Sequence, residues 1–121
     1  MEKFHEHSNN LEELIKKLPS YEEASELTDI LSALSDPTRL RILWLLCHTT
    51  ECVTDISIAI NMSAPAVSHH LKLLKQCKII ESKKIGKEMH YTLAANEHAR
   101  LIHNMIDNMF KITCPNLDHN D

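Results

Sequence analysis

The sequence predicts one small, mainly helical α+β domain that pairs with a second copy of itself. Apolar residues recur at the spacing of amphipathic helices over most of the 121 residues, a length that allows a single modest core. Residues 79–93 alternate instead as two strands around Gly86, the only glycine of the chain, where a tight hairpin needs a positive φ. The last helical stretch carries a wider apolar stripe than a small monomer needs, which predicts a homodimer.

The chain begins with a polar arm and a short amphipathic helix, which together occupy residues 1–20. Pro19 closes this helix, and residues 20–23 (SYEE) match a capping box at the start of the next helix. Asp36 caps a third helix and Pro37 suits its first turn. This third helix is apolar on nearly every side, so we expect it to be the central core helix. The stripes of the first two helices are Leu11, Leu14, Ile15 and Leu18, and Ala24, Leu27, Leu31 and Leu34.

Residues 48–51 are expected to form a loop, and a pair of helices follows it. The first is short, residues 53–60, and Asn61 and Met62 break its period before Ser63 caps the second. The stripe of the second helix is Val67, Leu71, Leu73 and Leu74. Helix, turn, helix and β-hairpin in this order predict a winged helix-turn-helix with a two-stranded wing.

A last helix completes the predicted domain of residues 21–112, and residues 113–121 are expected to be a flexible tail. We expect this helix to pair with its own copy through an apolar stripe. The predicted interface residues are Leu101, Ile102, Met105, Ile106 and Met109.

Composition argues against a membrane or a secreted protein and favours a cytoplasmic one. The chain has no run of about 18 apolar residues, which a membrane span needs, and no secretory signal at its N-terminus. The four cysteines, at positions 47, 52, 77 and 114, show no paired disulfide spacing. We therefore expect reduced thiols in a cytoplasmic protein.

Charge is divided unevenly along the chain. The net charge is −4, yet residues 63–91 hold six lysines against two glutamates, which gives +4. The remaining seven basic and fifteen acidic residues give −8. A basic region on the second helix and the wing favours contact with nucleic acid, although lysines at a hairpin edge also serve solubility alone.

The outer face of the second helix has the composition of a helix that enters the major groove of DNA. Short polar residues near its tip suit base edges, and long cations at its flank and on the wing suit phosphates. His70 turns inward or reaches a phosphate. The residues predicted near bases are Ser63, Ala64, Ser68 and His69, and those near phosphates are Lys72, Lys83, Lys84 and Lys87.

Four segments together resemble the ArsR/SmtB family of metal-responsive repressors. They are residues 34–43 (LSDPTRLRIL), 51–56 (ECVTDI), 62–74 (MSAPAVSHHLKLL) and 86–93 (GKEMHYTL). The resemblance covers roughly residues 27–109. It implies a homodimer that binds an inverted repeat in promoter DNA and releases it when an inducer binds, but it does not identify the inducer, the operator or the regulated genes.

The resemblance also implies a metal site where residues 51–55 meet the N-terminal arm. Cys52 matches the family's cysteine, Asp55 matches the carboxylate of the zinc-type version, and Thr54 stands where arsenic- and cadmium-type versions often carry a second cysteine. His5 or His7 could reach over from the arm. One thiolate, one carboxylate and one or two imidazoles suit Zn(II) or a similar divalent ion.

A second site of the family, across the paired last helices, is expected to be lost. Asn96, Met109 and Ile112 stand where it needs carboxylate and imidazole ligands. His103 and Asp107 share a helix face, either as an ordinary surface pair or as a remnant or replacement of that site.

Other readings of the cysteines and of the whole chain stay open. Cys52 packs as a small apolar residue and Asp55 caps a helix if the arm site is absent, so the alternative function is a thiol-responsive or constitutive regulator without a metal. Cys77 and Cys114 have no assigned role. An enzyme is not expected, because the sequence shows no nucleophile with a base partner and no phosphate-binding glycine loop. A winged helix that binds only proteins remains a rival class.

Overall fold

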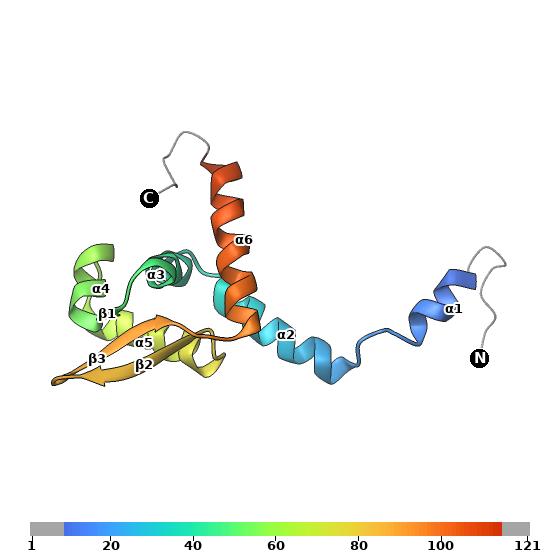
Figure 1. Cartoon of the computed structure of the whole chain (residues 1–121), viewed down its shortest axis with the longest axis horizontal. Helices are drawn as coiled ribbons and strands as arrows, with labels where there is room; N and C mark the ends of the chain where they lie inside the picture. The colour runs from blue at the N-terminus through green and yellow to red at the C-terminus, as the bar shows by residue number, and fades with distance from the viewer. Residues whose placement is uncertain (1–8, 115–121) are drawn as a thin grey trace.

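The computed structural model describes residues 9–114, which form six helices and three short strands. Their bounds are α1 (Asn9–Ile15), α2 (Tyr21–Leu34), α3 (Pro37–His48), β1 (Glu51–Cys52), α4 (Val53–Ile60), α5 (Ala64–Gln76), β2 (Ile80–Ile85), β3 (Glu88–Leu93) and α6 (Glu97–Thr113). The molecule is elongated, with α1 at one end of its longest axis and the turn between β2 and β3 at the other (Figure 1). The element order confirms the predicted winged helix-turn-helix.

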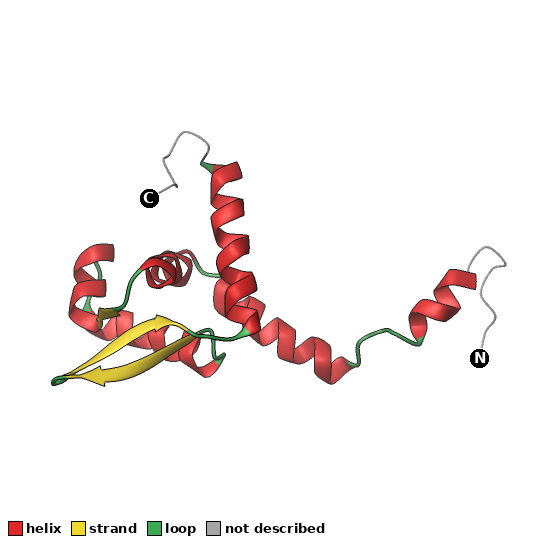
Figure 2. Ribbon diagram, viewed as in Figure 1, coloured by secondary structure: helices red, strands yellow, loops and turns green. Residues whose placement is uncertain are grey.

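The sheet has three antiparallel strands in the order β1-β3-β2, and it occupies the end of the molecule opposite α1 (Figure 2). The predicted hairpin is confirmed: Ile85 pairs with Glu88 across a two-residue turn in which Gly86 has a φ of +64°. The prediction of two strands was incomplete. Cys52 pairs with His90 in a third strand, β1, within a stretch expected partly as a loop. Two residues are too few to show strand alternation, and only the edge of β3 makes them a strand.

The core lies where α3, α4 and α5 meet β2 and the first half of α6. The prediction that α3 is the central core helix is confirmed, because Ile42, Leu43 and Leu46 are at most 1% exposed. The inward stripe of α5 is also confirmed, with Leu73 only half-buried. The other fully buried large side chains are Ile56, Val67, Leu71, Leu74, Ile79 and Ile80.

Helix starts follow the predicted capping residues. Ser20 and Glu23 form the complete capping box of α2, and Asp36 accepts the N–H of Arg39 at the start of α3. The first helix ends earlier than expected. It stops at Ile15, and the N–H of Leu18 bonds to the Ile15 carbonyl in a turn after the helix.

Apolar side chains on α1, α2 and α6 remain exposed in the single chain. In α2 only Ala33 is buried, so most of the predicted stripe does not join the core. Within residues 9–114, no helix is long and apolar enough to cross a membrane. The exposed large apolar residues of these helices are Leu11, Leu14, Ile15, Tyr21, Leu27, Leu31, Leu101, Met105, Met109 and Ile112.

Candidate functional site

Helix α5 is held so that its polar face points away from the core. Asn61 ends α4 in the left-handed conformation, with a φ of 56°, and turns the chain toward α5. The hydroxyl of Ser63 then accepts the N–H of Ala66 at 3.3 Å and caps α5. The residues left exposed on the outer face include Ala64, Ser68, His69 and Lys72. This is the face that the sequence predicts to read DNA.

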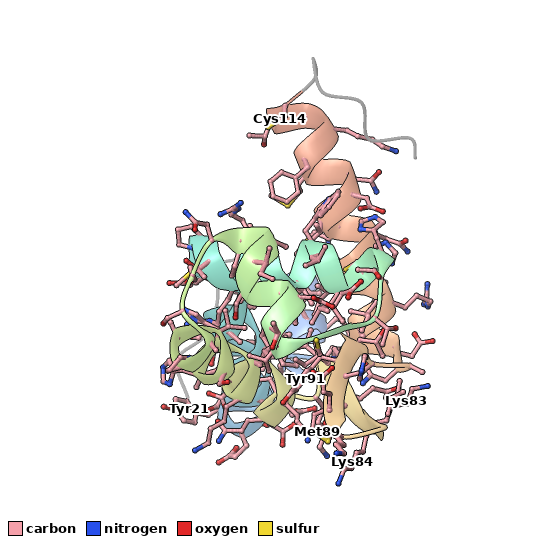
Figure 3. The ribbon with its side chains drawn as sticks, turned by 90° about the vertical axis from the view of Figure 1, so that its left-hand side faces the viewer. Tyr21, Lys83, Lys84, Met89, Tyr91 and Cys114 are labelled. Atoms are coloured by element: carbon pink, nitrogen blue, oxygen red, sulfur yellow. The ribbon has the colours of Figure 1, made fainter. Side chains whose placement is uncertain are left out.

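The wing adds cations beside this face. Lys83, Lys84 and Lys87 are exposed, and Lys83 and Lys84 point outward at the end of the molecule opposite Cys114 (Figure 3). Lys75 of α5 donates to the hydroxyl of Ser82 in β2 at 2.6 Å. This bond ties the wing to α5, so the two predicted DNA-contacting elements are presented together.

His70 differs from the other predicted DNA residues because it is half-buried. Its Nδ1 lies 3.4 Å from Nη1 of Arg39. The Arg39 guanidinium also donates to the carbonyls of Ala33 at 2.8 Å and Ser32 at 3.4 Å. Arg39 therefore joins the end of α2, the start of α3 and the middle of α5, a role that no pattern in the sequence indicated.

Cys52 and Asp55, the two described members of the predicted arm site, lie next to each other. The N–H of Asp55 lies against the Cys52 sulfur and lowers the pKa of the thiol, but burial and the carboxylates of Asp55 and Glu88 outweigh it and raise that pKa overall. Cys52 is buried and Asp55 is exposed. His5 and His7 lie outside the described residues, and α1 is at the opposite end of the molecule from β1 (Figure 1).

The other cysteines are only partly buried. Burial and the nearby Asp107 carboxylate raise the pKa of the Cys47 thiol to about 12. Cys77 ends α5 and its thiol lies 3.6 Å from the Asp29 carbonyl of α2. Burial and the Asp29 carboxylate raise the Cys77 pKa, with Arg39 opposing them. Both thiols are therefore held protonated more firmly than a free cysteine.

A cluster that sequence reasoning did not assemble joins α3 and α6. His48, expected in a loop, is the last residue of α3, and its Nε2 lies 3.6 Å from Oδ1 of Asp107. Nε2 of His103 lies 3.1 Å from Oδ2 of Asp107. The four-residue spacing of His103 and Asp107 was visible in the sequence, but nothing in the sequence pointed to His48.

Comparisons with known proteins agree with the winged helix-turn-helix fold. The family model described as "Bacterial regulatory protein, arsR family" matches residues 36–82. The chain is 29% identical over 103 residues to a transcriptional repressor SmtB homolog of Synechocystis sp., covering 85% of this chain and 78% of that protein. It is 35% identical over 86 residues to the cadmium resistance transcriptional regulatory protein CadC of Listeria innocua, covering 70% and 71%.

A solved structure shares the fold. The homodimeric winged helix-turn-helix DNA-binding domain of Mb0332 from Mycobacterium bovis superposes with a TM-score of 0.68 at 23% identity, over 85% of this chain and 97% of that one. This structure confirms the predicted fold, and the family model and the SmtB and CadC relatives, which are transcriptional regulators, confirm that an enzyme was rightly not expected. The chain therefore belongs to the ArsR family of bacterial regulatory proteins, whose members bind DNA.

Proposed function

We propose that this chain is a homodimeric repressor that binds an inverted repeat in promoter DNA and is released by a divalent metal ion such as Zn(II). The observation that carries the DNA part is the outward face of α5 beside the lysine-tipped wing. Three buried residues, Val67, Leu71 and Leu74, fix the rotation of α5 about its axis. That rotation leaves the short polar side chains free to meet base edges.

The assignment of single residues to DNA follows from their exposure. Ala64, Ser68 and His69 meet bases near the tip of α5, and the cap residue Ser63 lies beside them. The phosphate contacts are Lys72, Lys83, Lys84 and Lys87. His70 is placed against Arg39, so we propose that it orients α5 and touches at most a phosphate.

The homodimer is proposed from the apolar surface that one chain leaves open. Leu101, Met105 and Met109 of α6 are between 39% and 57% exposed, and they share one face of the helix. A hollow of about 360 Å³ beside this face is lined by Leu34, Leu40, Met105, Ile106, Met109, Phe110 and Thr113. Two such faces would cover each other in a twofold dimer, while Ile102 and Ile106 already pack in the core.

The metal response is proposed from the donor pair at the start of α4 and from relatives named for metal resistance. The adjacent Cys52 thiol and Asp55 carboxylate suit Zn(II) once the thiol is deprotonated. Because α1 lies at the far end of the molecule, His5 or His7 would come from the arm of the second chain. A bound ion would join that arm to α4, the helix that precedes α5.

A thiol-based switch is less favoured by the same residues. The pKa values of Cys47, Cys52 and Cys77 are all raised, and oxidation starts from the thiolate. A purely redox-responsive regulator would place its reactive cysteine where positive charge lowers the pKa. A raised thiol pKa also opposes metal binding, which needs the thiolate as well, so the preference for a divalent metal rests on the relatives named for metal resistance.

The test is fluorescence anisotropy of the reduced dimer on its own upstream promoter DNA, with and without stoichiometric Zn(II). The parent chain and Cys52→Ser are compared, with Cys77→Ser as the matched control. We expect zinc to weaken DNA binding by about tenfold or more in the parent and in Cys77→Ser, a coupling of at least about 1.4 kcal/mol. Cys52→Ser should bind DNA but respond less.

Two results would contradict the proposal. Tight DNA binding that zinc leaves unchanged in every variant removes the metal response. No binding of any promoter fragment, by a chain that is shown to be folded and dimeric, removes the operator claim itself.

A further inference from the structure

We propose that His48, His103 and Asp107 form a divalent-metal site that ties the end of α3 to α6. This site is separate from the one proposed at Cys52. One ligand atom from each of the three residues lies within 4.8 Å of the other two. His103 and Asp107 are one turn apart on α6, and His48 approaches them from the last turn of α3.

The spacing of the donor atoms is close to what a zinc-type ion requires. Ligands bonded at about 2.0–2.1 Å in a tetrahedron lie about 3.4 Å from one another. The two shorter separations here are 3.1 Å, from His103 Nε2 to Asp107 Oδ2, and 3.6 Å, from His48 Nε2 to Asp107 Oδ1. The third separation, between the ligand nitrogens of the two histidines, is no more than 4.8 Å, so the three donors are already gathered around one point.

A hydrogen bond from His48 to the main chain of Trp44 leaves Nε2 of the imidazole available as a metal ligand. Nδ1 of His48 lies 2.7 Å from the carbonyl oxygen of Trp44, which can only accept a hydrogen bond. The ring proton of neutral His48 must therefore be on Nδ1, and the lone pair on Nε2 points at the Asp107 carboxylate. Histidines that bind metals commonly donate their other N–H to a backbone carbonyl in this way.

The same bond leaves two electron-rich groups facing each other. In neutral His48 the Nε2 lone pair faces the Asp107 carboxylate at 3.6 Å, and a cation between the two, either a metal ion or a proton on Nε2, turns this repulsion into attraction. The ring of Trp44 packs against His48 with centroids 4.5 Å apart, and it limits how far the imidazole can turn away. A divalent ion in this position satisfies His48, His103 and Asp107 at once.

The chemistry of the donors and their exposure define the class of ion. Two imidazoles and one carboxylate, without a thiolate, suit Zn(II), Co(II) or Ni(II) better than the soft ions that need sulfur. The three side chains are 30–37% exposed, which leaves an entry path and room for water as the remaining ligand. The set therefore resembles an open three-ligand site rather than a closed structural one.

The position of the site suggests its regulatory use, which rests on the proposed function. His48 is followed after two residues by β1 and then by α4, while α6 carries the proposed dimer contacts. An ion held by α3 and α6 fixes the angle between these two helices, and so the position of α4 and α5 relative to the proposed dimer contacts. It changes the affinity for DNA only if this angle differs between the free and the DNA-bound protein.

The first experiment measures metal binding without DNA, in the full chain carrying Cys52→Ser so that the arm site is disabled. Co(II) is titrated, and its visible absorption and the quenching of Trp44, the only tryptophan, are recorded. We expect near-stoichiometric binding that Zn(II) reverses. His103→Asn and Asp107→Asn in the same background should each weaken it by about tenfold or more.

The matched control is His98→Asn, which removes an exposed histidine from the same helix. It should leave both signals unchanged, and circular dichroism should show that every variant is folded. Binding that survives His103→Asn and Asp107→Asn, or the absence of any Co(II) signal in the Cys52→Ser chain, would overturn the site. In that case the cluster is an ordinary interhelical ion pair.

Anisotropy on promoter DNA then separates this inference from the proposed function. Residual zinc release in Cys52→Ser that disappears when His103→Asn is added supports a regulatory site. Metal binding without any effect on DNA affinity overturns the regulatory part. Failure of the parent chain to bind DNA contradicts the proposed function, yet the cobalt titration still decides whether the metal site exists.

Discussion

At the scale of single residues, the same surface holds two kinds of polar side chain. Ser68, His69 and Lys84 are exposed, whereas His70 and Arg39 are half-buried and contact each other. Substituting an exposed residue should therefore change DNA binding with little effect on folding. Substituting an inward residue should change the folding of the domain first.

Lys84→Ala tests the role of an exposed residue in DNA binding. We expect weaker binding to all DNA sequences and a salt dependence whose slope falls by about one, because one phosphate contact is lost. Ser68→Ala should instead reduce the preference for the operator over unrelated DNA. Anisotropy titrations at several salt concentrations measure both, with Lys111→Ala on α6 as the control. Equal loss of folding in Lys84→Ala and Ser68→Ala would contradict the assignment.

Asp36 gives a pH prediction. The N–H of Arg39 lowers the pKa of Asp36 below its ordinary value of 3.8, and the charges of Arg39 and His70 act in the same direction against burial. Near and below this value the unfolded state binds more protons than the folded state. The stabilisation is therefore present above pH 3.8 and is lost as the pH falls through the lowered pKa.

The variant Asp36→Asn keeps a good capping residue but does not titrate. We expect its stability to fall less than that of the parent between about pH 5 and about pH 3. Urea unfolding at fixed protein concentration measures the difference, with Glu12→Gln on α1 as the control. Parallel curves for Asp36→Asn and the parent would show that this carboxylate does not contribute.

At the scale of elements, the residue that caps α6 connects this helix to the end of α5. Asn96 accepts the N–H of Ala99 at 2.9 Å and so caps α6. Its amide also donates to the carbonyl of Lys78, just after α5, at 2.9 Å. One side chain therefore orients α6 relative to the end of α5.

Asn96→Ala should lower the free energy of unfolding by about 1 kcal/mol, because it removes the cap of α6 and the bond to the Lys78 carbonyl, which water then replaces. Denaturant unfolding at fixed protein concentration should show a lower midpoint with an unchanged slope. Asn104→Ala, at an exposed position in the middle of α6, is the control and should cost nothing. A midpoint for Asn96→Ala equal to that of the parent would contradict the capping role.

At the scale of the whole molecule, one chain leaves much of its apolar surface uncovered. Its core is formed by α3–α6 and the sheet, with Ala33 near the end of α2, while other apolar residues of α1, α2 and α6 are exposed. Large exposed apolar side chains on three helices favour association with a partner. The partner proposed above is a second copy of this chain.

Leu101→Glu should shift the chain from dimer to monomer, because it places a charge in the proposed apolar contact. Analytical ultracentrifugation at micromolar concentration measures the shift, and affinity for a two-half-site operator should fall with it. Lys111→Glu, on the polar side of α6, is the control and should remain dimeric. A Leu101→Glu chain that sediments as the parent does would place the interface elsewhere.

Local patterns were sufficient for most of the fold. The capping residues Ser20, Asp36 and Ser63, together with Gly86, predicted where helices begin and where the hairpin turns, because these signals act between near neighbours in the chain. The exposed face of α5 followed from its apolar stripe. The division of charge between residues 63–91 and the rest of the chain pointed to the same face.

The sequence by itself therefore determined the order of the elements, the inward and outward faces of α5 and the class of partner. Tertiary structure alone decided which distant residues come together: Arg39 with His70, Cys52 with His90 across the sheet, and His48 with Asp107. Such pairs depend on the crossing angles of packed helices and on the register of the sheet. Neither is encoded in spacing along the chain, because both result from closing the core around Ile42, Leu43 and Leu46.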